Sequence, residues 1–421
     1  MKNFDIPIIY RSPLISAIKN RRKERDKMKK DFTPTHLNLG ALHIYLARHF
    51  GFCYGVENAI EISFRTIDEN PGRRIFLLSE MIHNPQVNSD LGSRGIRFLQ
   101  DTYGKQLIPF ETLQPDDIVI IPAFGTTLEI EEKLRRIGIR TEQYNSTCPF
   151  VEKVWNRSTQ IARNNYTIVV HGKPGHEETR ATFSHAAAVT PTVVVRDMAE
   201  ARVLAEYIRG TRPADSFCSV FQGQYSRGFD VNKDLTRIGV VNQTTMLASD
   251  TQAIADFLRQ TMIETYGDSA TSVEDPTAAE AAADRHFADT RDTLCYATLD
   301  NQTAVTGLLQ TNADLAIVVG GYNSSNTSHL VELCEQKMPT YFIRSEDNLL
   351  SPEEILHYDL HEKKEQNTQN WLPGRSRNPA RILLTSGASC PDILVEAVIR
   401  RIANFYDAED RIPALITQFA G

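Results

Sequence analysis

Several features that would assign a function directly are missing from this sequence of 421 residues. The longest apolar runs, such as LAIVVGG at 315–321, are far too short to cross a bilayer. No C-x-x-C pair occurs, which argues against a zinc ribbon and against a thioredoxin-type redox pair. Neither G-x-x-x-x-G-K-[ST] nor G-x-G-x-x-G is present, so the sequence does not support binding of ATP or NAD(P).

The sequence also has no excess of positive charge, because its net charge is −7. This balance gives no general reason to expect nucleic acid as a partner. One segment differs: KNRRKERDKMKK at 19–30 has eight basic residues against two acidic ones. It is a candidate contact for RNA, a membrane or an acidic partner, although a solvated helical extension is the favoured interpretation. It fits neither a secretory signal nor a transit peptide, so we expect a cytoplasmic protein without nucleic-acid or membrane partners.

Short β-rich runs alternate with amphipathic helical stretches, which predicts α/β domains with parallel sheets covered on both faces. The chain is long enough for two or three such domains. Two segments, 267–292 and 344–380, break the alternation and are interpreted as irregular surface insertions or connections. The expected strands are 74–79, 117–124, 166–172, 192–196, 315–321, 339–344 and 381–387, and the clearest helices are 56–70, 149–164, 250–267 and 328–338.

Three of the six cysteines share a local pattern. Cys53, Cys148 and Cys295 each end a loop just before an expected helix, where the helix dipole favours a thiolate. Three such thiolates suggest one shared site for an iron–sulfur cluster or zinc, with one metal position open. The alternative for any single cysteine is a small buried hydrophobic residue. The other three cysteines are expected to be structural. Cys334 is expected to be a core residue of a helix and Cys218 to lie in a strand, and Cys390 is adjacent to Ser389, a candidate binding residue.

Four polar loops follow expected strands, where a parallel α/β sheet binds its ligands. Their hydroxyl, amide and imidazole groups suit an anion, and a glycine-bounded His-x-Glu is a plausible proton-donor site. Plain helix caps, a satisfied loop histidine and surface carboxylates are the alternative interpretations. The loops are 81–88 with His83, 171–182 with His171, His176, Glu177 and Glu178, 321–328 with Ser324 and Asn326, and 385–392 with Ser389.

Taken together, these stretches resemble the 4-hydroxy-3-methylbut-2-enyl diphosphate reductase family of the non-mevalonate isoprenoid pathway. The matching stretches run in family order from about residue 45 to 402. They are GFCYGVENAI, EMIHNPQVN, STCPFVEKVW, HGKPGHEET, VVNQTTM, CYATLDNQ, GGYNSSNTSHL and SGASCPDILVE.

The resemblance implies a 4Fe–4S cluster held by Cys53, Cys148 and Cys295, with its fourth iron open to the hydroxyl of the substrate. It also implies removal of that allylic hydroxyl with two electrons and two protons, giving isopentenyl and dimethylallyl diphosphate. By motif match, Glu178 supplies a proton and Thr244 positions the hydroxyl. The diphosphate is then bound by His83, His176, Ser324, Ser325, Asn326 and Ser389.

The implied fold has three α/β lobes around the cluster. We expect a basic N-terminal extension at 1–44, lobe 1 at 45–147 and lobe 2 at 148–290. Lobe 3 is expected at 291–421, with an insertion at about 344–380. The expected electron donor is a separate protein of the ferredoxin or flavodoxin type, because no flavin or NAD(P) motif is present.

One position departs from many family members, which have a histidine where this chain has Phe124. This difference resembles the plant and cyanobacterial branch, and it leaves open what replaces the histidine contact. Two other functions also remain open at this stage. One is a cluster-dependent hydro-lyase without net electron transfer, and the other is a metal-binding regulatory protein with no use for the phosphate loops.

Overall fold

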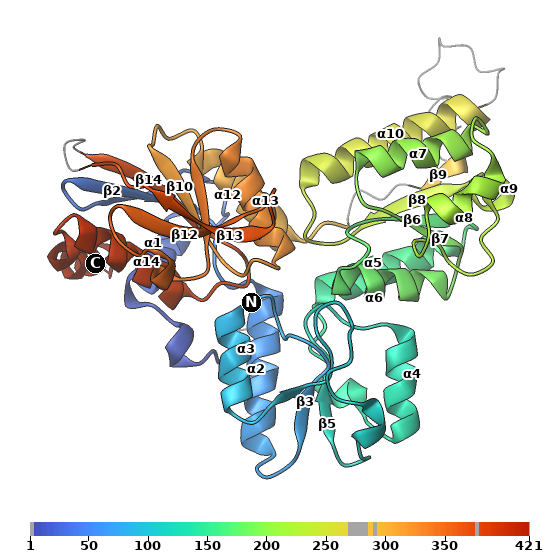
Figure 1. The fold of residues 1–421 in the computed structure, drawn as a ribbon, viewed down its shortest axis with the longest axis horizontal. Coiled ribbons are helices and arrows are strands. Elements are labelled where there is room, and N and C mark those ends of the chain that lie inside the picture. Colours follow the sequence, from blue (N-terminus) through green and yellow to red (C-terminus); the bar gives the residue numbers. More distant parts are fainter. Residues whose placement is uncertain (1–3, 268–284, 289–292, 375–378, 421) are drawn as a thin grey trace. The chain divides into compact units, whose positions relative to one another are not determined.

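The computed structural model describes residues 4–267, 285–288, 293–374 and 379–420. These residues form a mixed α/β protein with parallel sheets, which confirms the predicted α/β class and the parallel pairing (Figure 1). The chain divides into two compact units, and two of the four divisions fall inside helices α2 (Tyr54–Glu69) and α3 (Pro85–Ser93). Unit 1 comprises 1–61, 82–90 and 296–421, and unit 2 comprises 62–81 and 91–295. Among the described helices, none combines the length and apolar character needed to span a membrane.

Unit 1 is built on a five-stranded sheet with the strand order β1-β2-β14-β10-β11. Only the β1–β2 pair is antiparallel, and the other neighbours are parallel. Their apolar side chains form one continuous core with the surrounding helices. The strands are β1 (Thr35–Asn38), β2 (Leu42–Leu46), β10 (Leu315–Val319), β11 (Thr340–Ile343) and β14 (Ala380–Ser386). The helices are α1 (Pro13–Arg25), α12 (Tyr296–Leu308), α13 (Ser325–Glu335), α14 (Asp392–Phe405) and α15 (Ile412–Ala420), with 3-10 turns at Ile8–Tyr10, Glu346–Asn348 and Glu409–Arg411.

The order of strands in this sheet creates a switch point between β10 and β14. From β10 the chain passes through α13 to β11 on one side, whereas β14 lies on the other side of β10 and continues into α14. Both strands end at the same edge of the sheet because they are parallel. Open α/β sheets bind ligands at this kind of edge.

The basic segment at 19–30 belongs to a helix that is anchored in unit 1. Leu14, Ile15 and Ile18 of α1 are buried in its core, and α1 packs against α14 and α15. The boundary expected between 44 and 45 falls inside β2, which pairs with β14. Described residues before 45 therefore contribute to the sheet, through β1 and β2, and to its covering layer, through α1.

The segment 344–380 contains a regular β-hairpin, so the interpretation of this segment as irregular was wrong. Strands β12 (Glu354–Asp359) and β13 (Lys364–Gln369) pair in antiparallel register. Ile355 and Trp371 anchor the hairpin in the core, and the Trp371 indole donates a 3.0 Å hydrogen bond to the Ser351 carbonyl. The polar face of β13 hid this strand in the sequence.

Unit 2 contains two parallel sheets, each with its own apolar core. The smaller sheet has the order β4-β3-β5 and the larger has the order β7-β6-β8-β9. Their strands are β3 (Ile75–Leu77), β4 (Arg97–Phe98), β5 (Ile118–Ile120), β6 (Thr167–His171), β7 (Thr192–Val195), β8 (Ile238–Asn242) and β9 (Phe287–Ala288). The helices are α4 (Leu128–Ile137), α5 (Pro149–Ala162), α6 (Glu177–Ala187), α7 (Met198–Ile208), α8 (Phe217–Val220), α9 (Val231–Asp234) and α10 (Ala248–Tyr266), with 3-10 turns at Phe110–Thr112, Thr141–Tyr144 and Ala214–Ser216.

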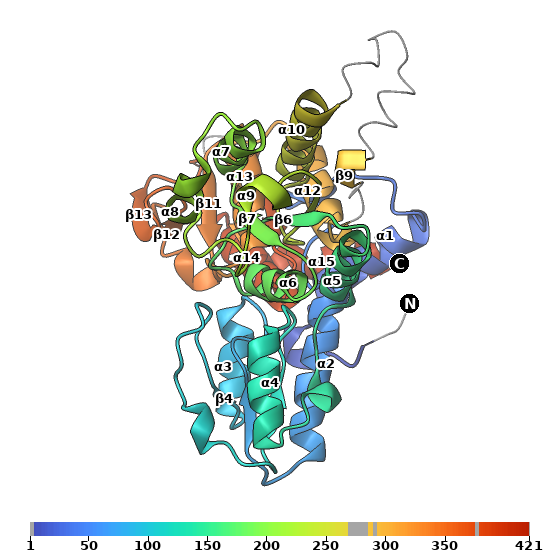
Figure 2. The same cartoon turned by 90° about the vertical axis from the view of Figure 1, so that its right-hand side faces the viewer.

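Helices cover both faces of the larger sheet. Figure 2 shows α7 and α10 on one side of it and α5 and α6 on the other. Val169 and Val193 pack with residues of α7 and α10, whereas Ile168 and Val194 pack with residues of α5 and α6. This alternation explains why the strands are apolar at every position.

All seven predicted strands occur at the expected places, as do the four clearest helices, with ends shifted by up to four residues. Cys218 was wrongly predicted in a strand, since it lies in the short helix α8. Strands β1, β2, β4, β8, β9, β12 and β13 were not predicted. Most of the segment 267–292 lies outside the described residues.

We expect the substitution Ile15→Ala to lower the free energy of unfolding by about 2–4 kcal/mol, because Ile15 is fully buried. Urea denaturation followed by circular dichroism measures this change. The exposed Lys23→Ala on the same helix is the control and should stay within about 0.5 kcal/mol of the parent. Equal stability of all three proteins would show that α1 is not part of the core.

Candidate active site

In unit 1, the loop after β10 leads into the N-terminus of α13. Ser324 caps this helix, because its Oγ accepts hydrogen bonds from the Thr327 N–H at 3.3 Å and from the Thr327 hydroxyl at 2.9 Å. Ser325 and Asn326 follow in the first turn and are buried. The helix therefore begins with polar side chains at the carboxyl edge of the sheet, where its dipole favours an anion.

Two glycines allow this helix start to pack against the sheet. A Cβ at Gly320 would lie 2.7 Å from the Thr327 hydroxyl oxygen, and a Cβ at Gly387 would overlap the same side chain. Gly320 follows β10 and Gly387 follows β14. Thr327 thus holds the two loops together, and neither loop has room for a larger residue there.

Four distant chain segments meet around this edge of unit 1. The Asn326 Oδ1 accepts a 2.9 Å hydrogen bond from the Ala388 N–H, and the Ala388 carbonyl accepts one of 3.1 Å from the Cys53 N–H. The Ser389 hydroxyl donates to the backbone carbonyl of His83 at 3.1 Å. The predicted residues Cys53, His83, Asn326 and Ser389 are therefore linked directly or through one neighbour.

Two buried polar groups at this edge have no hydrogen-bond partner among the described residues. They are the Asn326 Nδ2 and the Thr385 hydroxyl. Asn326 is 4% exposed and Thr385 is 1% exposed. Because a buried donor without a partner costs about 1–3 kcal/mol, each of these groups calls for a partner outside the chain, such as water or a ligand. The unmet amide donor of Asn326 fits an anionic ligand.

The β12–β13 hairpin supports the same loop through Tyr322. The Tyr322 ring stacks on Tyr358 of β12 with ring centroids 4.5 Å apart, and the Arg344 guanidinium lies 4.0 Å from its centroid. Burial raises the pKa of the Tyr322 phenol. The hairpin thus fixes the residue that precedes the polar sequence 323–326.

In unit 2, the loops after β6 and β8 bring Glu178 and Thr244 together. His176 caps α6, since its Nδ1 accepts a 3.2 Å hydrogen bond from the Glu178 N–H. The Glu178 carboxylate in turn accepts a hydrogen bond from the Thr244 N–H. Glu178 is 1% exposed. This bond fixes the orientation of the buried carboxyl next to the predicted hydroxyl-positioning residue.

Gln243 holds these two loops in place. Its Oε1 accepts hydrogen bonds from the Thr179 hydroxyl at 2.9 Å and from the Lys173 N–H at 3.1 Å. A Cβ at Gly172 would lie 2.6 Å from the Thr179 hydroxyl oxygen and 2.9 Å from the Gln243 Cβ. Gly172 therefore permits the close approach on which the Glu178 position depends.

The same strand ends are connected to both cysteine loops of unit 2. The Asn242 side chain at the end of β8 accepts a hydrogen bond from the Thr293 hydroxyl, two residues before Cys295. The Cys148 N–H donates to the Ala123 carbonyl at 3.0 Å. Phe124, the next residue, lies edge-to-face on the His176 ring with centroids 5.9 Å apart. An aromatic contact thus occupies the position where many family members have a histidine.

Each of the three candidate cysteines directly precedes a helix, as predicted: α2 begins at Tyr54, α5 at Pro149 and α12 at Tyr296. Glu57 and Glu152 each lie four residues after a cysteine and donate a backbone hydrogen bond to its carbonyl, at 2.9 and 3.2 Å. Burial raises the pKa of both carboxyls above the usual value for a glutamate.

The other cysteines differ from these three. Cys334 and Cys390 are fully buried, and burial raises the pKa of each thiol to about 12. Both therefore remain neutral packing residues, as expected for Cys334. Cys218 is exposed on α8.

The predicted site residues are distributed over both units. Unit 1 contains Cys53, His83, Ser324, Ser325, Asn326 and Ser389, and unit 2 contains Cys148, Cys295, His176, Glu178 and Thr244. Taken by itself, neither unit gathers three described His, Cys, Asp or Glu side chains close enough to hold a metal ion. The donor set nevertheless fits an iron–sulfur cluster, because these three cysteines form no disulfide and each precedes a helix.

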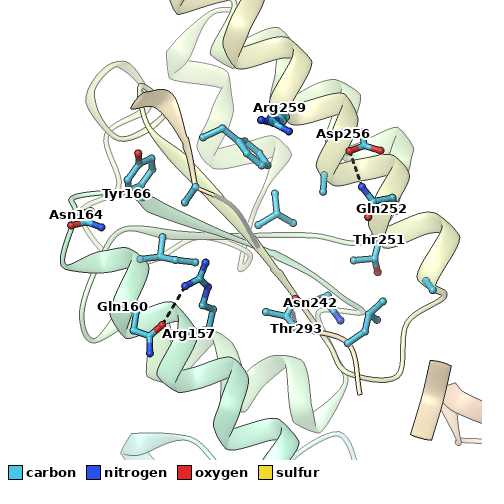
Figure 3. Close-up of a pocket in the computed structure, with 17 residues that line it drawn as sticks. Arg157, Gln160, Asn164, Tyr166, Asn242, Thr251, Gln252, Asp256, Arg259 and Thr293 are labelled. Atoms are coloured by element: carbon cyan, nitrogen blue, oxygen red, sulfur yellow. Dashed lines mark hydrogen bonds between the residues drawn. The ribbon is translucent and has the colours of Figure 1, made fainter. Parts of the chain in front are cut away.

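Unit 2 also has a cavity of about 710 Å³ near β8 and β9 (Figure 3). Asn242 and Thr293 line it, together with Arg157 and Gln160 of α5 and Thr251 of α10. His176, Glu178 and Thr244 do not line it. The cavity thus adjoins the loop before Cys295 but is not formed by the predicted catalytic residues.

Comparison with known proteins identifies the family. Residues 44–403 match the model of the family described as LytB protein. The chain belongs to this LytB family. A relative from Picosynechococcus sp., named 4-hydroxy-3-methylbut-2-enyl diphosphate reductase, is 38% identical over 93% of this chain and 89% of its own length. A relative of the same name from Gloeobacter violaceus is also 38% identical, over 87% of this chain and 84% of its own length.

Two solved structures resemble the fold of this LytB family member. One is a diphosphate reductase of Plasmodium falciparum, with a TM-score of 0.59 and 22% identity, covering 86% of this chain and 88% of its own. The other is described as the terminal enzyme of the non-mevalonate pathway, with a TM-score of 0.51 and 23% identity. The match covers 86% of this chain and 99% of the other. The resemblance predicted from the motifs is confirmed at the level of the family.

Sequence reasoning missed several residues that hold the site together. Asn242 and Gln243 were part of a quoted motif but received no role, and Thr327 and Thr293 were not singled out. The glycines that follow the strands, Gly172, Gly320 and Gly387, were the available signal. Each marks a place where another side chain, Thr179, Gln243 or Thr327, packs closely against the loop.

We expect Gly172→Ala to destabilise the protein by about 1–3 kcal/mol, because the added methyl meets Thr179 and Gln243. Thermal unfolding measures the change. The control is Gly175→Ala in the same loop, where a Cβ would have no atom within 4 Å. Equal melting temperatures for both variants would contradict the close packing described here.

Proposed function

We propose that this chain is a 4-hydroxy-3-methylbut-2-enyl diphosphate reductase, which catalyses the last step of the non-mevalonate isoprenoid pathway. The enzyme removes the allylic hydroxyl as water with two electrons and two protons. The products are isopentenyl and dimethylallyl diphosphate. Membership of the LytB family over 44–403 is the observation that carries this proposal. The 38% identity to relatives of that name supports it.

The proposed cofactor is one 4Fe–4S cluster held by Cys53, Cys148 and Cys295. Three cysteine ligands would leave one iron for the substrate. When bound, the cluster supplies electrons and a Lewis-acidic iron that weakens the carbon–oxygen bond. In this proposal each of three α/β lobes contributes one cysteine, with lobe boundaries near 148 and 291.

The diphosphate is assigned to His83, His176, Ser324, Ser325, Asn326 and Ser389. Asn326 and Ser324 support this assignment, because they begin α13 at the switch point of the unit 1 sheet. Neutral hydroxyl and amide donors at a helix N-terminus bind phosphate oxygens without nucleotide-binding motifs. The Asn326 Nδ2, which lacks a partner among the described residues, would donate to such an oxygen.

Glu178 is assigned as the proton source and Thr244 as the residue that orients the substrate hydroxyl. The hydrogen bond from the Thr244 N–H fixes one carboxyl oxygen of Glu178. Burial keeps bulk water away from the carboxyl, so the proton is delivered from a defined position. Phe124 contributes no hydrogen bond, and its contact with His176 orients that imidazole.

The electrons are assigned to a separate carrier of the ferredoxin or flavodoxin type, and the protein is assigned to the cytoplasm. A requirement for external reductant distinguishes a reductase from a hydro-lyase. A metal-binding regulatory protein would show no turnover.

The cluster assignment predicts about four iron and four acid-labile sulfide per chain after anaerobic purification. The Cys148→Ser variant should lose both the cluster and the turnover with reduced viologen. The Cys218→Ser variant is the control and should keep both, because Cys218 is exposed on α8. Zinc without sulfide in the parent protein would eliminate the reductase proposal.

The proton assignment predicts that Glu178→Gln keeps the iron content and substrate binding but lowers kcat by about 10²-fold or more. Glu177→Gln is the matched control, because Glu177 is the adjacent carboxyl on the same helix turn and should retain most activity. Steady-state turnover and substrate affinity are measured on anaerobic protein. A near-normal rate for Glu178→Gln would remove this residue from the mechanism.

A further inference from the structure

We propose that the basic segment formed by the last turn of α1 and the residues after it is the docking surface for an acidic one-electron carrier protein. The surface, called the basic surface below, consists of Lys23, Arg25, Lys27, Lys29 and Lys30 with the exposed side chains of Met28, Tyr296 and Leu299. All of these residues belong to unit 1. The inference rests on the proposed function, since it names the place where the electrons of that reaction enter.

The segment has a defined shape because of Asp26. The Asp26 carboxylate accepts hydrogen bonds from the Lys30 N–H at 3.1 Å and from the Asp31 N–H at 3.0 Å. Its Oδ2 also lies 3.6 Å from the Arg48 guanidinium. The backbone hydrogen bonds lower the pKa of Asp26 and keep it ionised. The lysines are thus presented on a closed turn.

Two of the three acidic residues between 23 and 31, Asp26 and Asp31, are occupied within the segment, and the third, Glu24, is exposed. Asp31 pairs with Arg22 at 3.3 Å, and its Oδ1 accepts the Thr33 N–H. In contrast, no described carboxylate forms an ion pair with Lys23, Arg25, Lys27, Lys29 or Lys30. The positive charges therefore face solvent on a protein whose net charge is −7.

Exposed apolar groups lie beside these charges. Met28 is 72% exposed, Leu299 is 45% exposed and Tyr296 is 37% exposed. Tyr296 and Leu299 are one turn apart on α12 and share a face of it. The Lys29 Nζ lies 6.0 Å from the centroid of the Tyr296 ring. A small apolar centre with a charged rim is typical of transient, electrostatically steered interfaces.

The position of Tyr296 in the chain points to electron transfer. Tyr296 directly follows Cys295, one of the three proposed cluster ligands. A protein bound at Tyr296 would thus contact the main chain one residue from that thiol. The proposed reaction consumes two electrons that the chain cannot generate, whereas no step of it uses a nucleic acid. These points favour an acidic redox protein over RNA as the occupant.

The test compares Lys27→Glu/Lys30→Glu with Lys363→Glu/Lys364→Glu. All four lysines are exposed in unit 1, in turns or at the end of a strand. Both double variants change the net charge by the same amount. Turnover is measured at low ionic strength with a reduced acidic 2Fe–2S ferredoxin and, separately, with reduced methyl viologen. The first variant should raise the KM for ferredoxin by about tenfold at unchanged viologen turnover. The control variant should leave both the KM for ferredoxin and the viologen turnover unchanged. Added salt should raise the KM of the parent protein for ferredoxin.

The results separate the docking surface from the proposed function. An unchanged KM for ferredoxin in Lys27→Glu/Lys30→Glu, with normal viologen turnover, would overturn the docking surface and leave the reductase intact. If that variant instead lost retention of a labelled single-stranded RNA, the surface would belong to a nucleic-acid site and the inference would be wrong. Absence of viologen turnover in the parent would eliminate both proposals together.

Discussion

The parallel pairing of β6 with β8 and of β10 with β14 is the constraint on which the candidate site depends. Parallel neighbours end at the same edge, so the loops that follow them meet although they are far apart in the chain. In unit 2 this pairing brings Glu178 to the backbone of Thr244, and in unit 1 it brings Asn326 to Ala388. The polar residues can remain buried because other loops supply most of their partners.

The structural elements around these edges serve mainly to hold loops in position. Thr327 lies between two glycines, Gln243 connects two loops, and the β12–β13 hairpin supports Tyr322. Such contacts give the proposed ligand-binding groups little freedom, which would lower the entropic cost of binding a small anion. Activity in this family member is therefore expected to depend on small residues that never touch the substrate.

Much of this arrangement was predictable from the sequence where a signal was local. The apolar runs of β6, β10 and β14 predicted buried strands, and cysteines ahead of helices predicted the thiol positions. Strands β1 and β2 were missed because the preceding basic segment suggested a solvated extension. The β13 strand was missed because both of its faces are polar. The Asn326–Ala388 bond joins residues 62 positions apart, and no local pattern encodes it.

The central position of β14 has a consequence for the order in which the chain folds during synthesis. Strand β2 is made early, yet one of its two partners in the sheet is β14, near the other end of the chain. One edge of the β1–β2 hairpin therefore stays unpaired until residue 386 has left the ribosome. Meanwhile unit 2 is complete at residue 295 and can fold first. The nascent hairpin thus carries an unpaired strand edge, a liability for aggregation, through most of synthesis.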